Sequence, residues 1–126
     1  MKKIYALAFL FLAACGSPPD TVIAKYTASD NGKTISLALN QTIAIVLDSN
    51  ASTGFVWNLT LEPDDKVLDF VTQEYATQGN LPGAGGIETW EFKAVGIGET
   101  NLKLEYFRPF EPKNIGKEFA LRVQVK

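Results

Sequence analysis

Histidine is absent from the 126-residue chain, and cysteine occurs only once, as Cys15. Without histidine, the chain cannot build the Ser-His or Cys-His pair that activates a catalytic nucleophile. Zinc sites made of histidine and cysteine are excluded for the same reason. A single cysteine also rules out an intrachain disulfide, so the folded state must rest on its hydrophobic core.

The chain also lacks any block of basic residues that alternates with aromatic ones. Lys and Arg number 12 and Asp and Glu number 14, a balance that argues against nucleic acid as a partner. Apolar residues make up 46% of the chain and charged residues 21%, which is typical of a folded globular protein rather than a disordered one. The length suits one domain.

The N-terminal segment has the composition of a secretion signal. Lys2 and Lys3 precede an apolar run over residues 4–12 that is too short to serve as a stable membrane span. The sequence Leu-Ala-Ala-Cys that ends at Cys15 resembles the bacterial lipobox. A plain signal-peptidase site just before Cys15, which would leave a free thiol, is the alternative.

The lipobox resemblance implies a lipid-anchored protein. Residues 1–14 would be the signal peptide, residues 15–20 a tether lipidated at Cys15, and residues 21–126 the domain. Acylation would anchor the chain firmly, because membrane affinity grows with each buried methylene. We expect it in a bacterial cell envelope on the extracytoplasmic side, and Gly16 after the cysteine favours the outer membrane if the cell is Gram-negative.

Beyond the signal, apolar and polar residues alternate in short runs, as in half-buried β-strands. The run 42–47 is apolar on both faces and is expected at the centre of a sheet, and 67–77 favours a strand over a helix. Asn31-Gly32 between two such runs predicts a hairpin. Other runs of this kind are 21–28, 35–39, 55–60, 90–94, 100–106 and 119–125.

These runs predict an all-β chain with about seven or eight strands and turn signals about every ten residues. The fold class that fits is an antiparallel β-sandwich of the immunoglobulin-like kind. Trp57 lies early on a strand, where such domains often bury a tryptophan. We expect Trp57, Trp90 and Tyr106 in the core, because each alternates with polar neighbours.

An enzyme that works through paired carboxylates is the one catalytic route left open by the composition. Glu62, Asp64, Asp65 and Asp69 cluster in sequence, but they surround a polar turn, where charges are usually solvated. We therefore expect a binding protein rather than an enzyme, with no metal and no cofactor.

Three small or glycine-rich loops interrupt the expected strands, and such loops on a rigid β-scaffold commonly carry function. The first consists of Asn50, Ala51, Ser52, Thr53 and Gly54. The second consists of Gly83, Ala84, Gly85 and Gly86, and the third of Arg108, Pro109 and Phe110.

In order and composition, these loops resemble the three signature loops of the chagasin family of cysteine-peptidase inhibitors. There the loops read Asn-Pro-Thr-Thr-Gly, Gly-x-Gly-Gly, and Arg-Pro-Trp or Arg-Pro-Phe. The resemblance covers about residues 33–126. It implies an immunoglobulin-like monomer whose loops form a wedge at one end, and reversible inhibition of papain-like cysteine peptidases through their active-site cleft.

The resemblance also implies a role for each loop. Residues 50–54 would enter the centre of the cleft, with Ser52 and Thr53 near the catalytic cysteine of the peptidase. Residues 83–86 would line one side of the cleft and residues 108–110 the other.

Two positions depart from the family pattern: Ala51 replaces a proline, and Phe110 stands where tryptophan is commonest. At other positions a structural role is the alternative to contact with the peptidase: Asn50 could cap its loop, and Gly54 could be required for the backbone conformation. Phe110 is expected to be exposed. The alternative function is that of an immunoglobulin-like envelope lipoprotein with an adhesive or scaffolding role.

Overall fold

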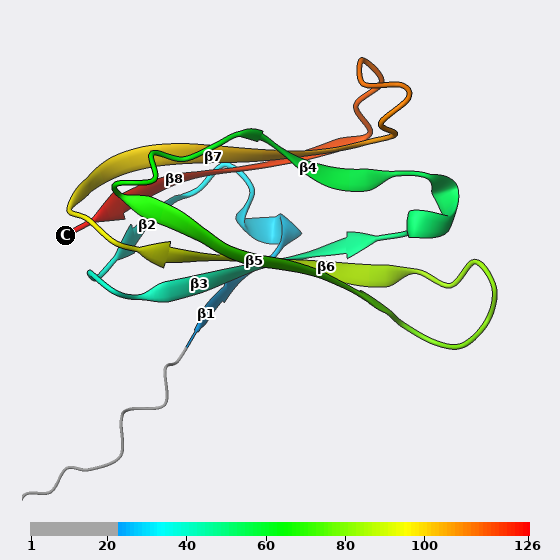
Figure 1. Cartoon of the computed structure of the whole chain (residues 1–126), viewed down its shortest axis with the longest axis horizontal. Coiled ribbons are helices and arrows are strands. Elements are labelled where there is room, and N and C mark those ends of the chain that lie inside the picture. Colours follow the sequence, from blue (N-terminus) through cyan, green and yellow to red (C-terminus); the bar gives the residue numbers. More distant parts are fainter. Residues whose placement is uncertain (1–22) are drawn as a thin grey trace, which may run out of the picture.

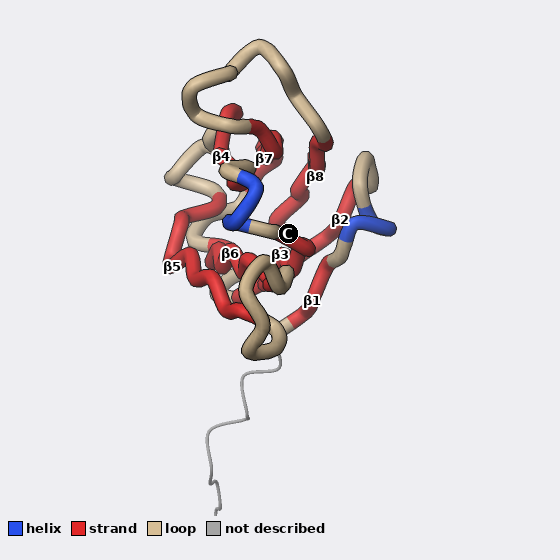
Figure 2. Tube along the Cα trace, turned by 90° about the vertical axis from the view of Figure 1, so that its right-hand side faces the viewer, coloured by secondary structure: helices blue, strands red, loops and turns tan. Residues whose placement is uncertain are grey.

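The computed structural model describes residues 23–126; the expected signal peptide and Cys15 lie outside this range. The described chain is all-β, and its eight strands form two four-stranded sheets that pack face to face (Figures 1 and 2). This confirms the predicted sandwich. Residues 23–126 contain no helix long and apolar enough to cross a membrane.

Each sheet is assembled from strands that are distant in sequence. The first sheet contains, in spatial order, β1 (Ala24–Tyr26), β3 (Thr42–Ser49), β6 (Gly86–Ala94) and β5 (Leu68–Thr77). The second contains β2 (Thr34–Leu37), β8 (Lys117–Val125), β7 (Gly98–Phe107) and β4 (Val56–Leu61). The central position of β3 is as its two apolar faces predicted.

The core lies between the sheets and is filled by the alternating apolar residues of the inner strands. In β8, every second residue from Phe119 to Val125 is buried, as the period-two pattern requires. The expected core residues Trp57, Trp90 and Tyr106 are all buried. The rings of Trp57 and Tyr106 meet at 5.0 Å between centroids, within the range of favourable aromatic pairs.

Two features of the topology differ from the sequence prediction. The edge strands β1 and β2 pair in parallel with β3 and β8, whereas the other four pairings are antiparallel. The predicted hairpin at Asn31-Gly32 is wrong, because β1 and β2 belong to different sheets.

The Asn31-Gly32 turn instead carries the chain from one sheet to the other. It follows a 3₁₀ turn, η1 (Ala28–Asp30), and docks on β8. The Ala120 amide donates to Asn31 Oδ1 at 2.8 Å, and the Gly32 amide donates to the Ala120 carbonyl at 2.8 Å. The Asn-Gly signal correctly marks a left-handed glycine, with φ of +85° at Gly32, but a local signal does not choose which strands pair.

All three loops singled out in the sequence lie at one end of the sandwich, on the right in Figure 1. The second and third loops close the hairpins β5–β6 and β7–β8. The first loop joins β3 to β4 and so crosses between the sheets. The opposite end carries the β4–β5 and β6–β7 turns and the C-terminus.

Candidate functional site

The first loop is a short 3₁₀ turn, η2 (Ala51–Thr53), closed by its own hydrogen bonds. The Asn50 side chain caps it, with Oδ1 accepting from the Ser52 amide at 3.1 Å and from Ser52 Oγ at 2.6 Å. Thr53 Oγ1 donates to the Asn50 carbonyl at 2.6 Å. Gly54 ends the turn in the left-handed region, with φ of +86°. The capping role of Asn50 and the conformational role of Gly54 are thus confirmed, and both loop hydroxyls are engaged within the loop.

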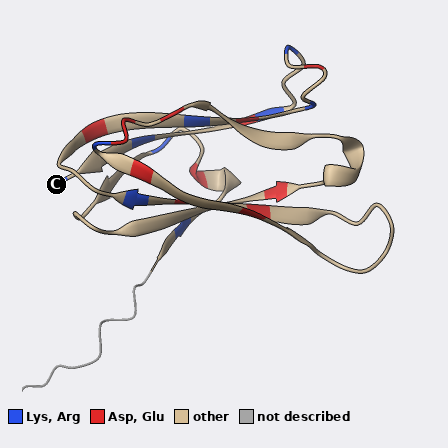
Figure 3. Ribbon diagram, viewed as in Figure 1, with Lys and Arg blue, Asp and Glu red and all other residues tan. Residues whose placement is uncertain are grey.

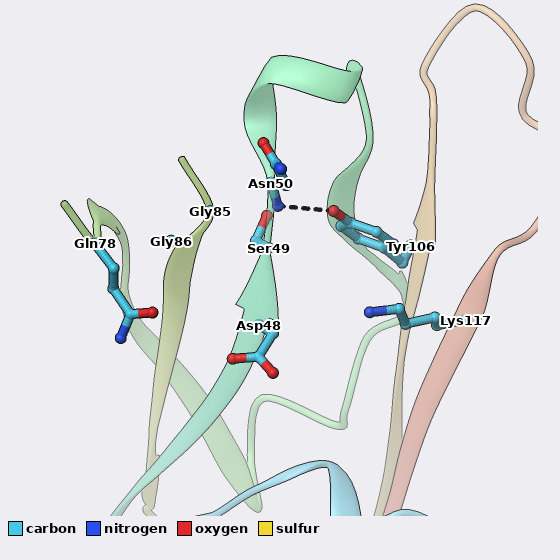
Figure 4. Close-up of a pocket in the computed structure, with 8 residues that line it drawn as sticks. All are labelled: Asp48, Ser49, Asn50, Gln78, Gly85, Gly86, Tyr106 and Lys117. Atoms are coloured by element: carbon cyan, nitrogen blue, oxygen red, sulfur yellow. Dashed lines mark hydrogen bonds between the residues drawn. The ribbon is translucent and has the colours of Figure 1, made fainter. Parts of the chain in front are cut away.

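The first loop is also tied to its surroundings. The Asn50 amide donates to Tyr106 Oη at 2.8 Å, as Figure 4 shows, which holds the loop to β7. Asn50 Nδ2 donates to the Gly83 carbonyl of the second loop at 3.3 Å. Asn50 therefore connects the first loop to both neighbouring elements. A shallow pocket beside this junction is lined from Asp48 to Asn50, by Gly85 and Gly86, and by Tyr106 and Lys117 (Figure 4).

Arg108 joins the third loop to the first. Its Nε donates to the Thr53 carbonyl at 3.0 Å, and its guanidinium carbon lies 4.6 Å from the centre of the Phe55 ring. Its Nη1 pairs with Glu111 Oε1 at 3.1 Å. Arg108, which was predicted from the sequence to contact the peptidase, is thus half-buried and already holds the first and third loops together.

Phe110 projects from the third loop, with 74% of its surface exposed. The expected exposure is confirmed. Pro109 precedes it and is exposed as well. An exposed aromatic ring of this kind is typical of an interface anchor.

The second loop contains a packing glycine as well as an exposed tip. Gly83 has φ of +80° and open space around it, and Ala84 donates to the Leu81 carbonyl at 3.0 Å. Gly86, by contrast, is the first residue of β6 and is buried. A Cβ at Gly86 would lie 2.5 Å from the Ala76 carbonyl oxygen, so this last glycine of the motif is needed for close approach of the strands.

Leu81 is an exposed residue that the sequence reading missed. With 80% of its surface exposed, it stands at the tip of the second loop. A single large apolar residue between Asn80 and Pro82, in a stretch without strand alternation, was the signal that could have found it.

Of the three loops, only the third is charged. The first two loops contain no charged residue, and the third carries its charges as the Arg108–Glu111 pair and Lys113 (Figure 3). Small uncharged loops can leave water at little cost, since removal from water is expensive chiefly for charged groups and for polar groups that lose their hydrogen bonds. The arrangement is therefore suited to enter a narrow groove.

The acidic residues considered for catalysis lie at the opposite end, around the β4–β5 turn (Figures 1 and 3). Asp64 shapes that turn: Oδ1 accepts from the Lys66 amide at 3.0 Å, and its carbonyl accepts from the Val67 and Leu68 amides. Among residues 23–126, no group of three or more potential metal ligands comes together.

The groups with shifted pKa values also lie away from the loops. Burial, with a contribution from nearby Asp30, raises the pKa of the Tyr26 hydroxyl. Hydrogen bonds from Lys33 Nζ and the Thr27 amide, each 2.8 Å long, lower the pKa of the Asp30 carboxyl. These residues belong to β1 and the turn that follows it, so they bear on stability rather than on the loop surface.

Comparison with known proteins agrees with this geometry. A sequence model described as the chagasin family of peptidase inhibitors matches residues 36–123. Chagasin of Trypanosoma cruzi is 31% identical over 102 residues, which cover 77% of this chain and 93% of that protein. Amoebiasin-2 of Entamoeba histolytica is 31% identical over 112 residues, covering 87% of this chain and 88% of its own.

The fold has solved counterparts too. The crystal structure of a cysteine protease inhibitor from Entamoeba histolytica superposes with a TM-score of 0.75 at 25% identity, covering 86% of this chain and all of that one. The two-sheet sandwich is thus shared with a family of inhibitors rather than enzymes. The chain belongs to the chagasin family of peptidase inhibitors.

Proposed function

We propose that this protein inhibits papain-like cysteine peptidases reversibly and occupies their active-site cleft with residues 50–54, 83–86 and 108–110. Inhibition of cysteine peptidases follows from the family to which the chain belongs and from its solved structural relative. The part played by each loop is our proposal. The observation that carries it is the meeting of all three loops at one end of a rigid sandwich (Figure 1).

Direct bonds between the loops favour their acting as one surface. Asn50 reaches the second loop through Gly83, and Arg108 reaches the first loop through Thr53. Loops ordered before binding lose less conformational entropy on association. The exposed side chains of Leu81 and Phe110 project from the two flanking loops, on either side of the uncharged first loop.

The shape of the first loop explains how it could enter the cleft without being cut. Its chain is turned, with the Thr53 amide donating to the Asn50 carbonyl at 3.1 Å and the Gly54 amide to the Ala51 carbonyl at 3.0 Å. A papain-like cleft admits an extended peptide, so a closed turn does not offer a carbonyl aligned for attack. Ser52 and Thr53 would lie nearest the catalytic cysteine of the peptidase.

The test is an inhibition titration with the purified chain from Gly16 to Lys126, which contains every strand of the structure. Papain and a cathepsin L-type peptidase are the targets, and a serine peptidase such as trypsin is the control. We expect reversible inhibition of the first two and none of the third. Absence of inhibition at micromolar concentrations, with the chain folded by circular dichroism, would contradict the proposal.

We further propose that the mature protein is a monomer anchored to the cell envelope through lipid on Cys15. The lipobox resemblance supports the anchor. The direction of β1 is compatible with it: Ala24 pairs in parallel with Ile43, near the start of β3, so the described chain begins at the end away from the loops. An anchor there would leave the loops facing outward.

The anchor can be tested in a bacterial host by replacing the cysteine. The unchanged chain should remain in the membrane fraction, whereas Cys15→Ala should be released in soluble form or kept as unprocessed precursor. Equal fractionation of the two proteins together with equal cleavage of their N-terminal segments would contradict lipidation.

A further inference from the structure

The first loop presents a structural problem that the other two loops do not have. Its flanking strands β3 and β4 lie in different sheets, so no backbone ladder joins them. Side chains must therefore hold the two sides of the loop in register. Two such bonds are already clear: the Asn50 amide donates to Tyr106 Oη at 2.8 Å, and Trp57 Nε1 donates to the Asp48 carbonyl at 3.0 Å.

A buried carboxylate, Glu88, completes this set of bonds. Glu88 lies on β6 and is only 3% exposed. Its Oε2 accepts from Ser49 Oγ at 2.8 Å and from the Trp57 amide at 3.1 Å. Ser49 is the last residue of β3 and Trp57 lies at the start of β4, so one oxygen atom binds both sides of the first loop.

The other oxygen fixes the carboxylate itself. Glu88 Oε1 accepts from Gln73 Nε2 at 3.1 Å and from Trp90 Nε1 at 3.2 Å. A carboxylate can accept about four hydrogen bonds, and Glu88 therefore uses its full capacity. Its four donors come from β3, β4, β5 and β6, which belong to both sheets.

A carboxylate in this position is expensive unless it is fully bonded. Burying an ionised group without partners costs far more than burying a neutral one. In the described part of the chain, the ion pairs lie at the surface and none includes Glu88. Hydrogen bonds to a charged acceptor are roughly twice as strong as neutral ones. Loss of the Glu88 carboxylate should therefore weaken the position of each residue that donates to it.

We propose that Glu88 is a positioning residue for inhibition: it fixes the spacing between Ser49 and Trp57 and thereby pre-orders the first loop for the cleft. This inference rests on the proposed function for its effect on inhibition. Its effect on the loop itself can be measured without any peptidase. If Glu88 only supported the sandwich, its substitution would lower the stability of the whole domain and would not make the first loop more mobile than the other two loops.

The test uses Glu88→Gln, which keeps the shape of the side chain but replaces one acceptor oxygen by an amide nitrogen. At least one buried donor loses its partner. We expect the inhibition constant for papain to rise about tenfold. In the free protein, exchange of the Ser52, Thr53 and Gly54 amides, which donate within the loop, should quicken about tenfold while the second and third loops stay unchanged.

Two variants serve as matched controls. Glu91→Gln makes the same chemical change on the more exposed face of β6 and should alter neither measurement. Val125→Ala removes buried apolar volume from β8 at the far end and should lower the unfolding midpoint without changing inhibition by the folded protein.

If Glu88→Gln does not fold, Ser49→Ala removes a single donor and should give a smaller change of the same kind in both measurements. The proposal is overturned if exchange in residues 52–54 is unchanged, or if it quickens equally in all three loops. If the unchanged protein fails to inhibit papain, the proposed function fails, and the exchange data still decide whether Glu88 orders the loop.

Discussion

The first loop and the two flanking loops are held in place by different means. The flanking loops close antiparallel hairpins, whose ladders continue to the Thr77–Gly86 pair on one side and the Tyr106–Lys117 pair on the other. The first loop spans the gap between the sheets and relies on side-chain bonds from Asn50, Tyr106, Trp57 and Glu88.

The difference matters for how the surface tolerates change. The paired strands fix the position of a hairpin loop, so substitutions at its tip should affect stability less than substitutions at its base. Backbone pairing does little to position the first loop, and its order depends on particular side chains within and below it. Substitutions at the base and at the tip of a hairpin loop, and substitutions in the first loop, test this contrast.

The largest effect is expected at the base of the second loop. Gly86→Ala would place a Cβ 2.5 Å from the Ala76 carbonyl oxygen and 2.7 Å from the Tyr75 ring, and should lower the free energy of unfolding by about 3 kcal/mol. Urea denaturation measures the change. Gly85→Ala is the matched control, since its Cβ would meet nothing closer than 3.9 Å. Equal losses in the two variants would contradict the assigned role of Gly86.

At the tip of the third loop, binding rather than stability should change. Phe110→Ala removes a ring that is 74% exposed in the free protein. We expect papain inhibition to weaken by about 2 kcal/mol, or roughly thirtyfold, with the unfolding midpoint unchanged. Ile97→Ala, which truncates an exposed apolar residue at the opposite end, should alter neither quantity. Unfolding of Phe110→Ala without a separate loss of inhibition would assign the ring to the core.

A proline should strengthen the first loop but weaken the second. Ala51 is the first residue of η2, and Asn50 before it is extended, at φ −130° and ψ 92°, so Ala51→Pro fits the backbone. Because the stiffer loop loses less conformational entropy on binding, the free energy of binding should improve by about 0.4–1 kcal/mol. This corresponds to a two- to fivefold lower inhibition constant.

The same substitution at Ala84 tests the other side of the contrast. The Ala84 amide donates to the Leu81 carbonyl at 3.0 Å, so Ala84→Pro removes a hydrogen bond and should weaken inhibition. If Ala51→Pro also weakened inhibition, the first loop would have to change shape in order to bind.

The smallest effect lies away from the loops, at Asp30. Its carboxyl has a lowered pKa in the folded state, chiefly through the Lys33 hydrogen bond. The stabilisation is therefore present above the unfolded pKa of about 3.9 and is lost as pH falls through the folded value. The difference in unfolding midpoint between the unchanged protein and Asp30→Asn should shrink below about pH 4, while inhibition at pH 7 is unaffected. A difference that does not vary with pH would refute this.

Much of the fold could be predicted because strand alternation is a local signal. The buried residues of β7 and β8 and the central place of β3 follow directly from the apolar pattern. Partner choice does not follow from such a pattern. The parallel edge strands and the crossing at Asn31-Gly32 depend on long-range docking, such as the bonds between that turn and Ala120.

The same limit applies to the site. The sequence located the three loops and anticipated the cap at Asn50 and the exposure of Phe110. It could not show that Arg108 would be bonded to Thr53, or that Gly86 would lie under Tyr75, because both depend on contacts between different elements of the chain. The role of Glu88 could not be predicted for the same reason. Strand alternation predicts which face of the sheet Glu88 lies on, but not that four hydrogen-bond donors from four strands meet at its carboxylate.

The central claim is that the three-loop end of the sandwich is the surface that meets the peptidase. Amide hydrogen exchange of the protein, free and bound to papain, tests it most directly. We expect new protection confined to residues 50–54, 79–85 and 108–112, with none in the turns 38–41, 62–66 and 95–97. Protection at those far turns or along the exposed strand β5, with the three loops unchanged, would contradict it.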